Sequence, residues 1–437
     1  MNIKKLFSLS WPVMLGMILQ TLLTSVDLFY ISKLGKDFAA AASLSNSSST
    51  VIFVLSSLVS AGVIALVSRS FGSGDEESVR AFSGISIILA VIIGAFLGIV
   101  CFIFTKSILS VMFNPSPRVM ALGYSYLSII FFGTSIVFLN SALRTILQAI
   151  GDTRTPLVIF GIANILNIIL DPIFMFTLNY SIKGAAIATV ISNFIGCILI
   201  FRVVIKKVYK NKLDLFFKSL QFNLKNWIRI LKIGWYFAVS QVARPITGMI
   251  MFRIVYSISK SDGTAAFGIG GQLFNYTFIF LVGLSTAISI IVGQSLGKGD
   301  VEEARTAIKY GIKFAVYNMT FFSFFYMVIP KVIIGIFIND ANVIQIGANY
   351  LRIVFIGLIF VVYSTIYGGV FQGAGDTFPP MMASIVSNVV FKLPCAYFLA
   401  MFMGINGVWI AVALSVVVES GILIYYYKKD KWITKEI

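Results

Sequence analysis

Residues 6–31 read LFSLSWPVMLGMILQTLLTSVDLFYI, an apolar run that carries a proline, Pro12, in its first half and a carboxylate, Asp27, in its last third. The run is long enough to cross the roughly 30 Å of hydrocarbon in a bilayer as a single helix. An acid inside such a helix costs roughly 2.5–3.5 kcal/mol on insertion scales. Asp27 therefore indicates a substrate pathway, a proton relay or an ion site.

The rest of the chain repeats this apolar pattern from end to end. Of its 437 residues, 58% are hydrophobic and only 12% are charged, too few polar residues to cover a soluble surface. Because no segment between the apolar runs could hold a soluble catalytic domain, we do not expect an enzyme. About twelve runs are long enough to span a bilayer, so the sequence predicts an all-α polytopic membrane protein. Their approximate bounds are 7–31, 38–68, 82–105, 120–148, 156–178, 184–206, 229–258, 264–294, 304–329, 343–371, 380–402 and 406–427.

The basic residues lie at the ends of these runs, although the formal net charge is +17. This distribution reports membrane topology and argues against nucleic acid as a partner. Lys and Arg are concentrated in the connections on one side of the membrane, among them Lys4, Lys5, Arg154 and the carboxy-terminal tail. The positive-inside rule then predicts that both termini lie in the cytoplasm. We expect a multi-pass protein of the plasma membrane. The cysteines lack metal or redox spacing, and no cofactor is expected.

Three motifs occur twice, each pair separated by roughly 224 residues and in the same order. They are SFGSGDEESVR at 70–80 and SLGKGDVEEAR at 295–305, QAIGDTRTP at 148–156 and QGAGDTFPP at 372–380, and IKGAAIA at 182–188 and INGVWIA at 405–411. Such spacing indicates a duplicated six-helix bundle whose halves are related by a pseudo-twofold axis along the membrane normal. We interpret the GxGD turns structurally, with both glycines at positive φ and Asp75 and Asp300 as helix caps. No strand or Lys-Ser/Thr accompanies them, which argues against a nucleotide loop.

The repeat predicts three parts of the chain. Residues 1–206 form an amino-terminal lobe and residues 229–437 a carboxy-terminal lobe. Residues 207–228 form the one long basic connection, which is amphipathic and is expected to lie at the bilayer surface as a cytoplasmic linker.

Two aspartates lie well inside predicted spans, Asp27 in the first and Asp171 in the fifth, at similar depth. Polar residues precede each acid at helical spacing, namely Gln20 and Thr24 before Asp27, and Asn164 and Asn167 before Asp171. A polar stripe that faced lipid would be expensive, so each stripe must line protein or water. The alternative is that both acids are neutral and only join helices through hydrogen bonds.

A proline follows the second acid directly. Pro172 lacks a backbone donor and clashes with the carbonyl group of Ile168, so the fifth span should bend there. Carboxylate, amide and carbonyl oxygens are hard ligands that suit a small cation or a proton network. Thr189 in the sixth span and Asn140 in the fourth are further candidates for the same chamber.

Basic residues inside spans are concentrated in the second lobe. Arg244 and Lys392 lie near mid-depth there. Arg244 either faces a substrate cavity, where it would attract anions, or pairs with a group such as Glu419. Arg144 and Arg253 lie nearer the ends of their spans, and we expect both side chains to reach the membrane surface.

The spans, the duplication, the GxGD turns and the QxxGDT segments together resemble the multidrug and toxic compound extrusion (MATE) family of secondary transporters, over essentially the whole chain. The chain is most similar to the DinF-like branch, including archaeal relatives, whose coupling site lies in the amino-terminal lobe. The resemblance implies a substrate chamber and a site that binds a proton or a cation, with Na+ as the possible metal ion. The site residues are Asp27, Asn167, Asp171 and Thr189, and the chamber residues are Gln20, Thr24, Asn140, Asn164 and Arg244.

The resemblance also implies antiport, in which H+ or Na+ enters and a small organic, drug-like compound leaves. The lobes would rock between outward-open and inward-open states, with Pro12 and Pro172 as hinges. We expect a monomer in the lipid bilayer with no cofactor other than the coupling ion.

Other functions remain open from the sequence. The nearest alternative is a flippase or exporter of lipid-linked or polyprenyl-linked saccharides from the same superfamily, which would have a strongly cationic central cavity. A lipid-linked glycosyltransferase would need a large catalytic loop or a metal cluster, and neither is visible. A channel fits poorly, because duplicated lobes suit alternating access better than a continuous pore.

Overall fold

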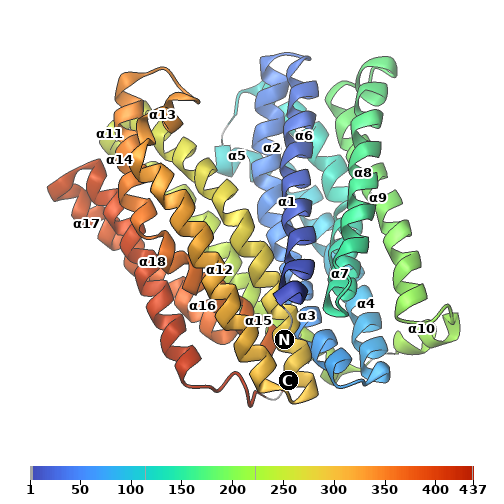
Figure 1. The fold of residues 1–437 in the computed structure, drawn as a ribbon. Helices are drawn as coiled ribbons and strands as arrows, with labels where there is room; N and C mark the ends of the chain where they lie inside the picture. The colour runs from blue at the N-terminus through green and yellow to red at the C-terminus, as the bar shows by residue number, and fades with distance from the viewer. Residues whose placement is uncertain (1–2, 114, 222, 436) are drawn as a thin grey trace. The chain divides into compact units, whose positions relative to one another are not determined.

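The computed structural model describes residues 3–113, 115–221, 223–435 and 437, and these residues form helices and short connections without strands (Figure 1). The first half contains α1 (Ile3–Ser32), α2 (Lys36–Leu55), α3 (Ser57–Gly72), α4 (Glu76–Ile103), α5 (Thr105–Phe113), α6 (Pro117–Phe132), α7 (Thr134–Ala149), α8 (Arg154–Pro172), the π-helix η1 (Ile173–Thr177), α9 (Ser181–Lys207) and α10 (Leu213–Ser219). The second half contains α11 (Leu224–Lys298), α12 (Val301–Val328), α13 (Pro330–Gly335), α14 (Ala341–Ile356), α15 (Leu358–Ala374), α16 (Phe378–Ser384), the π-helix η2 (Ile385–Lys392), α17 (Leu393–Met403) and α18 (Ile405–Lys428).

The chain divides into two compact units. The first unit spans residues 11–234, and the second spans residues 235–437 together with residues 3–10 at the start of α1. Within the second unit, Lys5 forms an ion pair with Glu303 at 3.5 Å. The boundary therefore crosses α1 between Ser10 and Trp11, directly before Pro12.

The helices are long and apolar enough for a multi-pass membrane protein. Among the described residues, eight helices could cross a membrane, or up to ten if each of two bent pairs counts as one span. One of the eight, α11, has 75 residues and contains two helices that meet at Ser259 and Lys260, where the backbone leaves helical geometry. The predicted spans 229–258 and 264–294 therefore both lie in α11. The span 304–329 corresponds to α12, which ends one residue earlier and is not included in the count of eight.

The GxGD turns have the structural role that the sequence predicted. Asp75 accepts a hydrogen bond from the backbone N–H of Ser78 at 3.0 Å, and Asp300 accepts one from Glu303 at 2.8 Å. Only the second glycine of each turn has a positive φ, +76° at Gly74 and +75° at Gly299. The prediction for the first glycines was wrong, because the preceding helices continue through these positions.

The linker belongs to the first unit and packs against its other helices. The Tyr209 side chain is fully buried, its hydroxyl group donates a hydrogen bond to the carbonyl oxygen of Arg80 at 3.1 Å, and its ring packs edge-on against Phe216. Burial raises the pKa of Tyr209 to about 12. Phe217 and Leu213 remain exposed, so only one face of α10 is covered.

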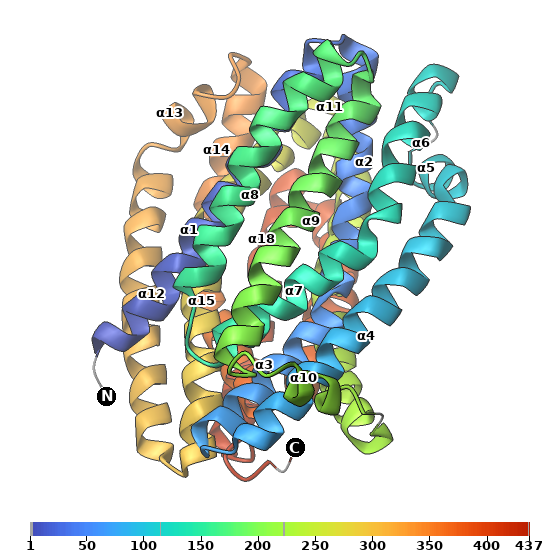
Figure 2. The same cartoon turned by 90° about the vertical axis from the view of Figure 1, so that its right-hand side faces the viewer.

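Glycines allow close packing inside the first unit. A Cβ atom at Gly94 of α4 would lie 2.8 Å from the Cα of Ser135 in α7, and one at Gly98 would lie 2.6 Å from the carbonyl oxygen of Phe131 in α6. Small residues at such contacts are typical of helix packing in membranes. In both views α8 and α9 also run side by side (Figure 2).

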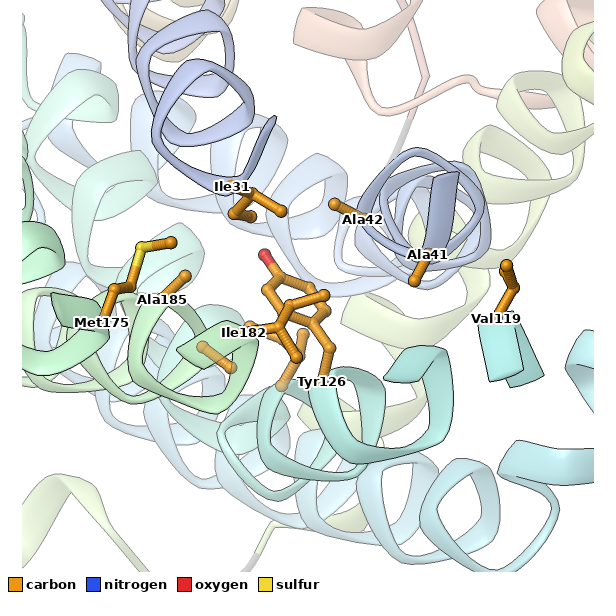
Figure 3. Close-up of a cluster of buried hydrophobic side chains, with 10 residues drawn as sticks. Ile31, Ala41, Ala42, Val119, Tyr126, Met175, Ile182 and Ala185 are labelled. Carbon is orange, nitrogen blue, oxygen red and sulfur yellow. The ribbon is translucent and has the colours of Figure 1, made fainter. Parts of the chain in front are cut away.

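An apolar cluster joins the carboxyl-terminal end of α1 to its neighbours in the same unit. It consists of Ile31, Ala41, Ala42, Val119, Tyr126, Ile130, Met175, Ile182, Ala185 and Ala186. In Figure 3 the Tyr126 ring lies in the middle of this cluster, and its hydroxyl group points toward Ile31. The cluster thus holds α1, α2, α6, η1 and α9 together on one side of the candidate site.

Candidate substrate and cation site

A cavity of about 490 Å³ lies inside the first unit. Its polar lining includes Gln20, Thr24 and Asp27 from α1, Asn140 and Arg144 from α7, Asn164 and Asn167 from α8, and Thr189 from α9, together with polar residues of α2 and α6. The structure therefore brings together around one space most of the residues that the sequence singled out. Asp171 and Arg244 do not line this cavity, and Arg244 belongs to the second unit.

Asp171 lies behind the cavity wall with no exposed surface, next to Asn167, which is 1% exposed. The side-chain amide of Asn167 donates a hydrogen bond to Asp171 Oδ1 at 3.3 Å. The carboxyl groups of Asp27 and Asp171 lie within hydrogen-bonding reach of each other. Two carboxylates at such a distance repel each other, so the pair is stable only with a proton or a cation between the two groups.

Several oxygen atoms of this group have no donor. In the described part of the chain, Asp27 Oδ1, Asn167 Oδ1 and Asp171 Oδ2 are buried and lack a hydrogen-bond partner. Buried acceptors without partners are costly, which indicates a ligand that supplies positive charge. Oxygen atoms of carboxylates and amides are the donors that hard cations prefer. The residues present therefore fit either Na+ or a proton.

Pro172 marks a change of helix type beside the acid pair. The α8 helix ends at Pro172, and the backbone continues as the π-helix η1 from Ile173 to Thr177. Since proline cannot donate the expected backbone hydrogen bond, a wider turn relieves the clash that an α-helix would suffer. Asp171 is consequently held at the junction of two helix types.

The polar residues of α7 and α9 are tied to each other. The Asn140 side-chain amide donates to the carbonyl oxygen of Asn193 at 2.8 Å, and the Asn193 amide donates to that of Thr189, also at 2.8 Å. The Thr189 hydroxyl donates to the carbonyl oxygen of Ala185 at 2.9 Å. Its lone pairs remain available to the cavity, whereas Asn140 serves to hold α7 against α9.

Two residues line the cavity that were not assigned to it from the sequence, Tyr126 and Arg144. Tyr126 lines the cavity and is 4% exposed. It lies close enough to Asp27 and Asp171 to interact electrostatically with both carboxyl groups. Arg144 also lines the cavity, and whether its side chain reaches the membrane surface stays a prediction. Arg144 lies five residues from the end of α7, so its side chain could extend toward the cavity or toward the membrane surface. Only the packing of the neighbouring helices decides between these two directions.

The second unit holds a different charged group. Arg244 donates to Glu419 Oε1 at 2.6 Å, and the other carboxylate oxygen lies 3.4 Å from both Ser387 Oγ and Asn388 Nδ2. Lys392 donates to the side-chain oxygen of Asn388 at 2.6 Å. Of the two roles open to Arg244, the structure shows the paired one.

These features are those of a helical membrane transporter with its polar cavity inside one lobe. A family model described as MatE matches residues 12–173 and 237–398, and the chain belongs to this family. A "Probable multidrug resistance protein NorM" of Thermotoga maritima is 24% identical over 444 residues, which cover 98% of this chain and 93% of the relative. An "FAD transporter" of Shewanella oneidensis is 25% identical over 434 residues, which cover 96% of this chain and 93% of the relative.

Solved structures show the same fold. A crystal structure of MATE in the bent conformation superposes with a TM-score of 0.91 at 23% identity, covering 99% of this chain and 96% of that chain. The two-lobed helical fold predicted from the sequence is thereby confirmed.

Proposed function

We propose that this protein exports small organic compounds in exchange for H+ or Na+, which binds at Asp27 and Asp171. The observation that carries the proposal is the set of buried oxygen atoms without donors at the wall of the first-unit cavity, Asp27 Oδ1, Asn167 Oδ1 and Asp171 Oδ2. The curated relative from Thermotoga maritima, named as a multidrug resistance protein, supports the export of small compounds. The location of the acids in the first lobe supports the DinF-like branch.

Coupling follows from where the cation binds. A cation between Asp27 and Asp171 removes their repulsion and lets α1 and α8 approach each other, which changes the shape of the cavity that the substrate occupies. Because the two ligands then favour different states of one cavity, the inward movement of the ion drives the substrate outward. Thr189 and Asn167 would complete the oxygen ligands of Na+.

The hinges have structural support of their own. Pro12 lies inside α1, next to the point where the boundary between the compact units crosses that helix. Pro172 lies at the change from α-helix to π-helix beside Asp171. We infer that α1 bends around Pro12 as the lobes alternate, with the monomer in the plasma membrane and both termini in the cytoplasm.

Proteoliposomes test the proposal. The purified protein should move fluorescent dyes of graded charge when a pH gradient or a sodium gradient is imposed, and the two gradients applied separately identify the coupling ion. Asp27→Asn and Asp171→Asn should each reduce gradient-driven transport to the level of empty liposomes, because an amide neither exchanges a proton nor neutralises Na+.

The matched control is Asp37→Asn, which removes an acid of the same lobe whose partner is Arg118 at 3.2 Å. This variant should transport like the unmodified protein. Gradient-driven transport that persists in both Asp27→Asn and Asp171→Asn would show that the cation site lies elsewhere.

A further inference from the structure

Arg144 is a charged cavity residue without a partner. Its side chain is exposed in the first-unit cavity, and across the residues that the structure describes its guanidinium group forms no ion pair and no hydrogen bond. Other arginines of the same unit do have partners, for instance Arg118, which pairs with Asp37, and Arg80, which pairs with Glu76. A guanidinium group that lacks a counter-ion inside a membrane-spanning lobe is available to a ligand.

Hydroxyl groups lie on the same side of the cavity. Ser141 precedes Arg144 by one helical turn on α7, and both line the cavity together with Ser56, which separates α2 from α3. The Ser141 hydroxyl lies 2.9 Å from that of Ser60 and 3.4 Å from that of Ser56. The Ser56 hydroxyl also lies 2.7 Å from the carbonyl oxygen of Phe53, to which it donates in the absence of a ligand. Because hydroxyl hydrogens can rotate toward a ligand, this group can offer donors next to a fixed positive charge.

The acid pair is too far away to neutralise Arg144. Asp27 is the only acid among the described residues that line the cavity. Arg144 lies five residues before the end of α7, and Ile159 lies five residues after the start of α8, so both are near one level. Asp171 follows twelve residues later on α8, which is about 18 Å along the helix axis. The cavity is therefore negative at one end and positive at the other.

We propose that Arg144, with the hydroxyl groups of Ser56 and Ser141, binds an oxyanion of the transported compound, which makes organic anions and zwitterions the preferred substrates. The inference rests on the proposed transport function and names its substrate class. A planar guanidinium group matches a carboxylate, phosphate or sulfonate group with two parallel hydrogen bonds. Phe53 and Phe160 line the same cavity and offer apolar surface to the organic body.

The duplicated lobe has no equivalent of this subsite. The repeat offset of roughly 224 residues places Gly368 opposite Arg144. A Cβ atom at Gly368 would meet nothing within 4 Å, so a side chain would have had room there. At this position of the repeat, the positive charge thus belongs to the first lobe alone.

Two dyes that differ in a single group test the proposal without any ion gradient. Rhodamine 110 has a free carboxylate, and rhodamine 123 is its methyl ester. Binding to the purified full-length protein in detergent, followed by fluorescence anisotropy, should favour rhodamine 110. Arg144→Gln should weaken rhodamine 110 about tenfold, the loss expected for one charge-assisted pair, and should leave rhodamine 123 unchanged or tighter.

Matched variants identify the cause of such a loss. Arg118→Gln removes an exposed arginine of the same lobe and should change neither dye. Arg144→Lys keeps the charge but loses the planar fork, so the loss for rhodamine 110 should be intermediate. If Arg144→Gln does not fold, Arg144→Lys and Ser141→Ala decide the question, since each should weaken rhodamine 110 more than rhodamine 123.

Two results would overturn the proposal. One is an equal change for both dyes in every Arg144 variant that folds. The other is Arg144-dependent binding of dihexanoylphosphatidylglycerol with no difference between the dyes, which would assign the subsite to a lipid headgroup. Asp27→Asn should keep the preference for rhodamine 110, so the subsite and the coupling site can fail independently.

Discussion

Asp171 in the first lobe and Glu419 in the second are both buried acids of the membrane-spanning region, with 0% and 7% exposure. Asp171 has one oxygen without any donor and a second acid, Asp27, beside it. Glu419 has a guanidinium group 2.6 Å from one oxygen and two further polar side chains near the other. The buried acid of the first lobe therefore lacks a positively charged partner, whereas the buried acid of the second lobe is paired with an arginine of the same lobe.

This difference separates binding from structural support. A buried acid with all its partners present has little to gain from a ligand, whereas one without them gains the full hydrogen-bond and charge energy when a ligand arrives. A duplicated fold can therefore keep both lobes stable and place ion binding in only one of them. Substituting the charged residues of one lobe at a time tests this difference between the lobes.

Glu419→Ala should produce the largest loss of stability. It leaves Arg244 partly buried without its carboxylate, and breaking such a pair costs roughly 2–3 kcal/mol, at the lower end because Arg244 keeps exposed surface. Thermal unfolding of the purified protein in detergent should show the loss. Asp27→Asn should leave stability unchanged or raise it, because it removes repulsion. Similar losses in the two variants would remove the distinction between the lobes.

Removing both partners of the ion pair should cost less than removing one. In Arg244→Met/Glu419→Leu no charge is left unpaired, and apolar replacement of a buried pair is often close to neutral, within about 1 kcal/mol. Unfolding of the double variant should therefore lie close to that of the unmodified protein. A double variant as unstable as Glu419→Ala would show that Ser387, Asn388 and Lys392 depend on the carboxylate itself.

The helix caps should show where the lobes are alike. Asp75→Ala and Asp300→Ala each remove one hydrogen bond to a backbone N–H three residues later, and each should cost about 1 kcal/mol. Hydrogen exchange followed by mass spectrometry should show equal loss of protection at the starts of α4 and α12. The Asn variants should lose less, because Asn caps nearly as well as Asp. A strongly unequal effect would argue against equivalent turns.

The sequence was sufficient for the acids because a carboxylate in an apolar run is conspicuous. Asp27, Asp171 and the amides before them could be found by position and helical spacing alone. The capped turns could also be predicted, because Asp75 and Asp300 accept hydrogen bonds from backbone N–H groups only three residues later in the chain. Interactions between residues that are close in the chain can therefore be recognised from the sequence.

Contacts between distant segments left no such signal. Arg244 and Glu419 are 175 residues apart in the chain, so the choice between pairing and facing a cavity depended on how α11 and α18 pack. Tyr126 could not be distinguished from the other aromatic residues of a chain with 40 Phe and 18 Tyr. Both cases depend on tertiary packing, which hydropathy and spacing do not encode.

The smallest effect should come from the ion pair between Asp152 and Lys207 in the first lobe. Burial by itself would raise the pKa of Asp152, but hydrogen bonds from Lys207 and Thr155 hold it below its ordinary value. A pKa lowered by folding adds stability above the unfolded pKa of roughly 3.9, and this contribution is lost as the pH falls through the lower folded value. Because the Lys207 side chain is 42% exposed, Asp152→Asn should cost only about 0.5 kcal/mol at pH 7 and nothing in strong acid. Chemical unfolding of the unmodified protein and of Asp152→Asn at a series of pH values measures this difference in stability. Lys207→Gln should lose as much stability at pH 7 as Asp152→Asn. A loss of stability that does not change with pH would show that Asp152 acts through its cap on Thr155 rather than through its charge.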